Sequence, residues 1–190
     1  MKDVFEVRWH GRGGQGAKTA SQFLGEAALE SGKYIQAFPE YGPERAGAPM
    51  RAYTRISDKV IRVHSSVKNP DVVVVIDPTI LDAEDVTEGL DKDGVLLVNT
   101  PDSPETIRTK TGFKAGKVAT CDATKISLEL LKMSMPNTPM LGALLKVVAA
   151  VPVESIEKEI KNKFLKKIGQ EKTDANINSV RRAYQEVKVG

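Results

Sequence analysis

The sequence predicts an α/β fold: a Rossmann-like, open, mostly parallel sheet with an antiparallel strand pair and a helical C-terminal part. Two runs, 71–77 (DVVVVID) and 94–100 (GVLLVNT), are almost wholly apolar, as is typical of strands buried on both faces of a parallel sheet. Helix-like and strand-like runs alternate up to residue 122, and only helical patterns follow. We therefore expect one domain over 1–190, with a sheet core at 1–122 and helices of 123–190 packed on it.

The first elements follow from hydrophobic periodicity. Apolar and polar residues alternate over 4–9, which predicts a strand, and apolar residues recur at intervals of three to four over 15–31, which predicts a helix. Gly32 is the expected end of that helix. A second strand is predicted at 34–38, followed by a loop rich in proline and glycine at 39–49.

The runs 50–57 (MRAYTRIS) and 60–65 (VIRVHS) both show strand-like alternation. Only a short link at Asp58 and Lys59 joins them, which is too short for a parallel crossover. The two runs are therefore predicted to pair as an antiparallel hairpin.

The remaining elements are a weaker strand at 117–122 and several helices. We expect Thr138 to be the N-cap of a buried helix, with Pro139 at its first position. The predicted helices cover 79–90, 103–111, 123–134, 137–151, 153–167 and 170–187.

Composition excludes several functional classes. The net charge of +3 is mild, and the lysines near the C-terminus are interspersed with acidic residues, so no nucleic-acid partner is expected. No apolar run is long enough for a membrane span, and no signal-peptide pattern opens the sequence, so a cytoplasmic location is expected. One cysteine, Cys121, and two histidines, His10 and His64, cannot form a cysteine-ligated cluster or a structural zinc site. We interpret both histidines as polar residues at strand edges.

A glycine-rich loop lies between the first strand and the first helix. Gly11, Gly13 and Gly16 match G-x-G-x-x-G in the strand–turn–helix context where that motif has meaning. Such a loop places free N–H groups and the positive end of a helix dipole against a phosphate, and Arg12 and Lys18 would add charge. The alternative is that the glycines only permit a tight turn.

The rest of a dinucleotide-binding fingerprint is incomplete. The acidic residue expected at the end of the second strand is matched only by Glu40, in a turn-rich stretch after Pro39. A P-loop is absent because Ala17 separates Gly16 from Lys18. The loop therefore favours a ligand that carries a pyrophosphate, but the rest of the sequence disfavours a dinucleotide such as NAD and disfavours ATP hydrolysis.

Two further stretches are expected at the same crevice. One is the loop that contains Arg45 and Gly47, and the other is the helix start at Asn137 and Thr138, which could equally be a capped buried helix. No catalytic or metal-ligating residue is predicted. The candidate cofactor-binding residues are Gly11, Arg12, Gly13, Gly14, Gln15, Gly16, Lys18, Arg45, Gly47, Asn137 and Thr138.

Three segments occur in an order that identifies a family. WHGRGGQGAKTAS (9–21), AFPEYGPERAGAPMRAYTRIS (37–57) and PNTPMLGAL (136–144) together resemble the gamma subunit of 2-oxoacid:ferredoxin oxidoreductases, most closely the pyruvate synthase type. The resemblance covers essentially the whole chain. It implies a complex that converts pyruvate, coenzyme A and oxidised ferredoxin to acetyl-CoA, CO2 and reduced ferredoxin, reversibly.

The resemblance also implies a division of labour among alpha, beta, gamma and delta subunits in a heterotetramer of anaerobic metabolism. Thiamine diphosphate with Mg²⁺ and the 4Fe-4S clusters would be on partner subunits, and this chain would hold no cofactor alone. It would lack a complete active site, assist assembly and admit CoA. Open alternatives are a relative that uses 2-oxoglutarate, 2-oxoisovalerate, indolepyruvate or oxalate, a free-standing NAD-dependent oxidoreductase, and a purely structural subunit.

Overall fold

A seven-stranded sheet runs through the molecule, with the strand order β2-β3-β1-β4-β5-β6-β7. The computed structural model describes residues 3–41 and 47–190. The strands are β1 (Val4–Arg12), β2 (Tyr34–Tyr41), β3 (Pro49–Ser57), β4 (Val72–Val75), β5 (Val95–Asn99), β6 (Lys117–Cys121) and β7 (Lys188–Val189). The predicted α/β class is confirmed.

The centre of the sheet is parallel and its two margins are antiparallel. β1, β4, β5 and β6 pair in parallel, as their apolar runs predict. β3 pairs antiparallel with both β1 and β2, and β7 pairs antiparallel with β6. The sequence pattern did not indicate β7, because two residues carry too little periodicity to predict a strand.

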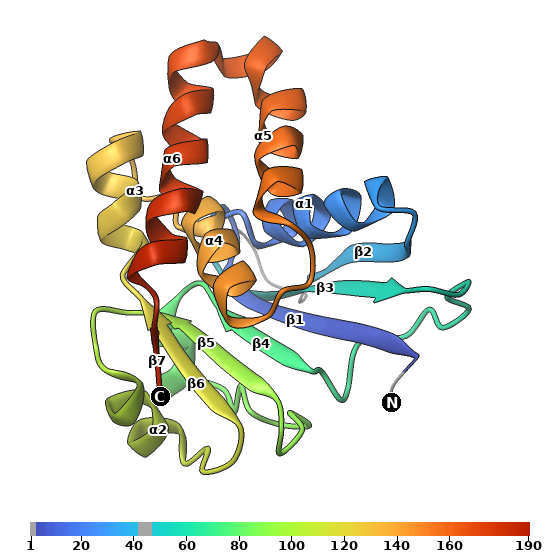
Figure 1. The fold of residues 1–190 in the computed structure, drawn as a ribbon. Coiled ribbons are helices and arrows are strands. Elements are labelled where there is room, and N and C mark those ends of the chain that lie inside the picture. The colour runs from blue at the N-terminus through green and yellow to red at the C-terminus, as the bar shows by residue number, and fades with distance from the viewer. Residues whose placement is uncertain (1–2, 42–46) are drawn as a thin grey trace.

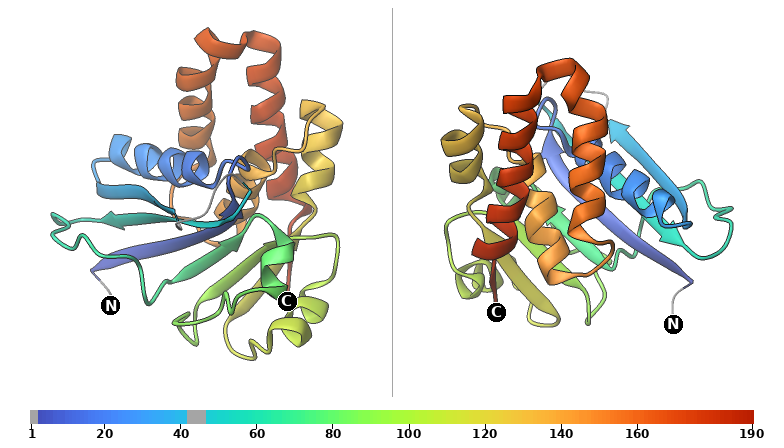
Figure 2. Two further views of the ribbon diagram at one scale, coloured as in Figure 1. Left: turned by 180° about the vertical axis from the view of Figure 1, so that it is seen from behind. Right: turned by 45° about the horizontal axis from the view of Figure 1, so that its top comes forward.

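Helices cover the two faces of the sheet unequally (Figures 1 and 2). α1 (Ala17–Glu30), α4 (Asn137–Val147), α5 (Val153–Ile168) and α6 (Gln170–Glu186) lie over one face, and α5 and α6 form a hairpin that extends away from the sheet. α3 (Ala123–Leu131) lies beside α6. The short η1 (Pro78–Asp82) and α2 (Pro104–Thr111) lie on the opposite face. The division of the chain at residue 122 stays a prediction.

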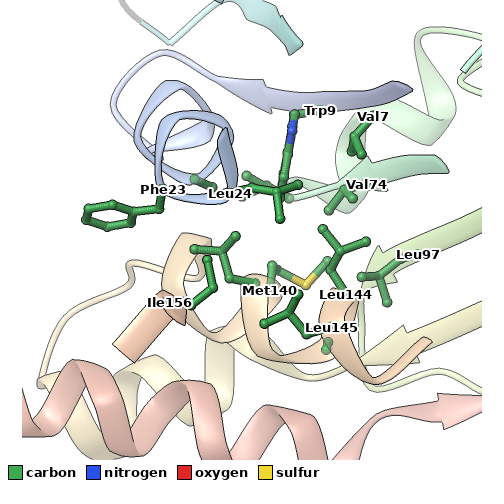
Figure 3. Packing of buried hydrophobic residues seen from close by; sticks show 14 of the residues in the cluster. Val7, Trp9, Phe23, Leu24, Val74, Leu97, Met140, Leu144, Leu145 and Ile156 are labelled. Atoms are coloured by element: carbon green, nitrogen blue, oxygen red, sulfur yellow. The ribbon is translucent and has the colours of Figure 1, made fainter. Parts of the chain in front are cut away.

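The larger core lies between the sheet and α1, α4 and α5. Trp9, Val74 and Leu97 point from three neighbouring strands toward Met140 and Leu144 of α4 (Figure 3). Alternate residues of β4 face the other way, and Val73 and Val75 belong to a second core beneath η1 and α2. The helix α4 is buried from Asn137 to Leu145, as its nearly uniform apolar sequence predicts.

Two predicted elements are wrong. Residues 60–65 form no strand, because β1 and β2 already occupy both hydrogen-bonding edges of β3. Residues 79–90 form no α-helix: the short 3-10 helix η1 ends at Asp82 and is followed by turns and a bend. Asp77 starts η1 by accepting the backbone N–H of Thr79, and the chain then leaves helical geometry after Asp82.

Candidate functional site

The glycine loop follows β1, the strand from which the chain adds later strands first on one side and then on the other. From β1 the chain continues through α1 toward β2 and β3 on one side, whereas β4 leads to β5 and β6 on the other. The carboxyl ends of β1 and β4 are therefore adjacent at a topological switch point, which is where open α/β sheets bind ligands. Gly11 lies at this end of β1, and a Cβ there would lie 3.3 Å from Ala17 Cβ and 3.7 Å from Ile76 Cβ. Glycine thus permits the close approach of β1, α1 and β4.

Two glycines of the loop have left-handed backbone. Gly14 has φ 95° and Gly16 has φ 82°, a region that side chains with a Cβ rarely adopt. Two amides of the loop are already used: Gly13 N donates to Ala48 O at 3.1 Å, and Gln15 N donates to Arg12 O at 3.1 Å. Gly13 therefore holds the loop against the start of β3 rather than offering its N–H to a ligand.

A polar network braces the loop against the end of β4. Gln15 Nε2 donates to Asp77 Oδ2 at 2.6 Å, and Gln15 Oε1 accepts from Arg12 N at 2.7 Å. Arg12 Nε lies 3.3 Å from Asp77 Oδ2, and its guanidinium also donates to Thr79 Oγ1. Burial acts to raise the pKa of Asp77, but hydrogen bonds from Thr79 and Gln15 and the charge of Arg12 outweigh it and lower the pKa. Asp77 is therefore ionised, and it neutralises much of the charge of Arg12.

The N-termini of α1 and α4 meet beside the loop. Gly16 is the N-cap of α1 and Pro136 is the N-cap of α4, and neither helix receives a side-chain cap. A Cβ on Gly16 would lie 2.5 Å from Asn137 Nδ2, so the first residue of α4 packs directly on the α1 N-cap. The first N–H groups of an uncapped helix have no partner within the helix and carry a partial positive charge. Two such helix N-termini converge here.

Asn137 carries an unsatisfied acceptor at this junction. The residue is 4% exposed, and its Oδ1 makes no hydrogen bond within the described chain. Buried polar atoms almost always have partners, so an orphaned one beside a loop of this type favours a missing ligand atom or water. Above Gly14, in contrast, a Cβ would meet no atom of the described residues within 4 Å.

The other predicted residues are placed as follows. Lys18 is exposed in the first turn of α1, and Gly47 O accepts from Arg12 Nη1 at 3.3 Å. Thr138 is not the N-cap of α4 as predicted, because the helix begins at Asn137 and its N-cap is Pro136, two residues earlier. Its buried hydroxyl donates to Asn176 Oδ1 of α6 at 2.9 Å, so it fixes α4 to α6. Arg45 lies outside the described residues.

A buried charged ladder lies on the face of β1 opposite α1, and sequence reasoning missed it. Arg8 Nε donates to His10 Nε2 at 3.0 Å, and Arg8 Nη2 donates to Val86 O and Glu88 O. His10 Nδ1 lies 3.6 Å from Glu84 Oε2, which also accepts from Arg51 Nη2 at 3.0 Å. These contacts hold the segment after η1 onto the sheet. The signal available in the sequence was the alternation of Arg8, His10 and Arg12 along β1.

The expectation that both histidines occupy strand edges is wrong. His10 is 1% exposed on the central strand β1, and His64 is exposed in a segment that is not a strand. Burial lowers the pKa of His10 although Glu84 opposes the shift, so the ring is neutral at pH 7. Its Nε2 accepts from Arg8, and Nδ1 therefore carries the proton that faces Glu84.

The position of Glu40 weakens the dinucleotide interpretation. In the dinucleotide-binding fold the second strand lies next to the first, and its terminal acid reaches the ribose. Here β3 separates β2 from β1. Glu40 accepts from Tyr53 Oη and Ser66 Oγ, so its carboxylate is engaged away from the glycine loop.

Comparison with known proteins decides the family. The model for the family described as Pyruvate ferredoxin/flavodoxin oxidoreductase matches residues 6–186. The chain belongs to this family. The chain is 61% identical over 187 residues to the pyruvate synthase subunit PorC of Thermotoga maritima, covering 98% of this chain and 96% of that protein. It is 48% identical over 186 residues to the pyruvate/ketoisovalerate oxidoreductases common subunit gamma of Pyrococcus furiosus, covering 98% of each.

A solved structure shares the fold. The crystal structure of the pyruvate oxidoreductase subunit PORC from Thermotoga maritima superposes with a TM-score of 0.89 at 56% identity, over 100% of this chain and 99% of that one. The resemblance inferred from the three sequence segments is thereby confirmed for the family and the fold. Among the described residues, no helix combines the length and the apolar character needed to cross a bilayer.

Proposed function

We propose that this chain is the gamma subunit of a pyruvate:ferredoxin oxidoreductase, the enzyme that forms acetyl-CoA and CO2 from pyruvate and CoA while reducing ferredoxin. The observation that carries the proposal is the 61% identity to a pyruvate synthase subunit over nearly the full length of both chains. Its partners are the alpha, beta and delta subunits, and ferredoxin acts through the assembled complex in the cytoplasm.

The chain's own residues fit a supporting role in that chemistry. Its one cysteine, Cys121, is buried, and burial raises the pKa of its thiol to about 12, so it is neither a nucleophile nor a cluster ligand. The 4Fe-4S clusters are therefore assigned to partner subunits, and the family resemblance implies the same for thiamine diphosphate and Mg²⁺. Those groups would supply the carbanion and electron-transfer chemistry.

The glycine loop is proposed to receive a phosphate group of CoA. The uncapped N-terminus of α1 provides N–H donors, and that of α4, whose first residues are buried, adds a partial positive charge. Gly14 leaves room for the approach of a phosphate, and Lys18 adds an exposed positive charge. Arg12 contributes little net charge because Asp77 balances it. Arg12 and Gln15 instead keep the loop in shape. Asn137 Oδ1 would accept a hydrogen bond from a water beside the phosphate, because an ionised phosphate has no hydrogen to donate.

The choice of 2-oxoacid is proposed to be made mainly by other subunits. The relative from Pyrococcus furiosus is named a gamma subunit common to pyruvate and ketoisovalerate oxidoreductases. A gamma chain that serves two oxidoreductases does not by itself discriminate between their substrates. The pyruvate assignment for this chain rests on the higher identity to the pyruvate synthase subunit.

The test is steady-state kinetics of the assembled enzyme that carries Lys18→Ala in this chain. Removing one phosphate contact from a charged side chain should raise the KM for CoA about tenfold, while the KM for pyruvate stays unchanged. Lys92→Ala is the matched control, because Lys92 is also exposed but precedes β5 at the opposite end of the sheet.

Three outcomes separate the interpretations. A selective rise in the KM for CoA supports the phosphate site. An unchanged KM for CoA in Lys18→Ala and in Gly14→Val, with assembly intact, would leave the chain a purely structural subunit. Binding of NADH to the isolated chain would favour the free-standing dehydrogenase instead.

A further inference from the structure

Residues 60–64 have the sequence of a strand but pair with no strand of the described chain. The run Val-Ile-Arg-Val-His has high β-propensity, and the sequence pattern predicts a strand there. The structure gives it no ladder, because β3 is already paired on both edges. The strand propensity of residues 60–64 thus disagrees with their conformation in the structure, and this disagreement needs a physical reason.

The segment is anchored to the sheet through carbonyl groups alone. Gln36 Nε2 donates to Ile61 O at 3.5 Å, and Arg55 Nη1 donates to Val63 O at 3.4 Å. Arg55 is buried and is itself held by Glu6 at 2.8 Å, whereas both contacts to the segment are long for hydrogen bonds. The N–H groups of residues 60–64 donate no hydrogen bond within the described part of the chain. The backbone donors of this segment are thus left open to a partner.

The segment also exposes apolar side chains. Val60 is 60% exposed and Val63 is 54% exposed. Arg62, His64 and Lys68 beside them are exposed as well, whereas the neighbouring Asp58 is paired with Lys33 at 2.5 Å. The surface therefore combines apolar contact area with an excess of positive charge.

We infer that residues 60–64 are a docking strand, which adds to the edge of an acidic strand or extended segment in a partner subunit of the same oxidoreductase. Main-chain hydrogen bonds would satisfy the open N–H groups, as in other cases of strand addition. Val60 and Val63 would be covered, and Arg62 and Lys68 would select a partner of opposite charge. The inference rests on the proposed function, since it requires that the chain assembles with other subunits.

Hydrogen exchange of the full chain, alone and in the purified complex, tests this directly. In the chain alone the amides of 60–64 should exchange as open loop amides do. In the complex some of them should exchange at least about tenfold more slowly, because an added strand protects the amides that it bonds. Unchanged exchange in an intact complex overturns the inference and leaves the proposed function untouched. Failure of any partner subunit to co-purify overturns both.

A pair of variants adds a second readout. Val60→Glu/Val63→Glu should reduce co-purification of partner subunits at least about tenfold, through lost apolar contact and like-charge repulsion. The unfolding free energy of the isolated chain should stay unchanged, because both side chains are exposed. The control is Leu128→Glu/Met133→Glu, at residues 50% and 54% exposed near the end of α3. Equal loss in test and control, or protection of 60–64 in a homodimer of this chain, contradicts the inference.

Discussion

Replacing Gly16 with alanine probes the junction of α1 and α4 on which the proposed phosphate site depends. The substitution has two separable costs. One is backbone strain, because Gly16 has φ 82° and a left-handed residue with a Cβ costs about 1–2 kcal/mol. The other is steric, because the new Cβ would lie 2.5 Å from Asn137 Nδ2 and 2.6 Å from Asn137 Cγ.

A control variant at Gly14 separates the cost of backbone strain from the cost of the steric clash. Gly14 has φ 95°, and a Cβ there would meet no described atom within 4 Å, so Gly14→Ala has the strain without the clash. We expect Gly14→Ala to lower the unfolding free energy by about 1 kcal/mol, after the smaller entropy of the unfolded alanine chain offsets part of the strain. Overpacking against a buried residue adds about 1–3 kcal/mol, so Gly16→Ala should cost about 3 kcal/mol.

Urea unfolding of the full chain measures both variants, together with Asn137→Ala and the double variant. Removing the Asn137 amide should recover about 2 kcal/mol of the Gly16→Ala cost, which appears as a coupling energy in the double-mutant cycle. Equal losses in Gly14→Ala and Gly16→Ala, or a cycle without coupling, would refute the close packing of Asn137 on the α1 N-cap.

Two ionisable residues give further predictions, both measured as unfolding free energy against pH. The His10 side chain and the Arg51 guanidinium lower the pKa of Glu84 to about 2. The ionised Glu84 therefore stabilises the folded chain above about pH 4.5, and this stabilisation is lost as the pH falls toward 2. Glu84→Gln should lower the unfolding free energy by about 2 kcal/mol at pH 7 and leave it unchanged near pH 2. Burial and the nearby Glu26 raise the pKa of Glu159. Its ionisation therefore destabilises the fold as pH rises above 4.5, and Glu159→Gln should be more stable by about 1 kcal/mol at pH 7 but not below pH 4. A pH-independent effect of either variant would contradict the assigned charges.

The strands that could be predicted are those whose own residues indicate how the strand is buried. The apolar runs of β4 and β5 identify buried parallel strands, and the helical periods of α1, α5 and α6 place those helices within a few residues. The partner of β3 was not predictable in the same way. Its pairing with β1 joins residues such as Val4 and Ser57, and nothing local in the sequence encodes that register. The strand-like run after β3 was therefore mistaken for its partner.

The structure brings some of the predicted site residues together, and their binding role stays a prediction. Gly16 and Asn137 meet at one junction, and Gly47 O accepts from Arg12 Nη1 of the same glycine loop. Asp77 was missed, although an acid directly after a buried strand at a switch point is a recognisable signal. The hydrogen bond from Gly13 N to Ala48 O could not be predicted, because it depends on where the chain before β3 lies in space.

The most direct test of the account is to purify this chain from its host by an affinity tag and to determine the mass, subunit content and visible spectrum of what it carries. The account predicts a brown assembly with further subunits that reduces ferredoxin only when pyruvate and CoA are both present. A colourless monomer or homodimer that binds NADH would contradict it.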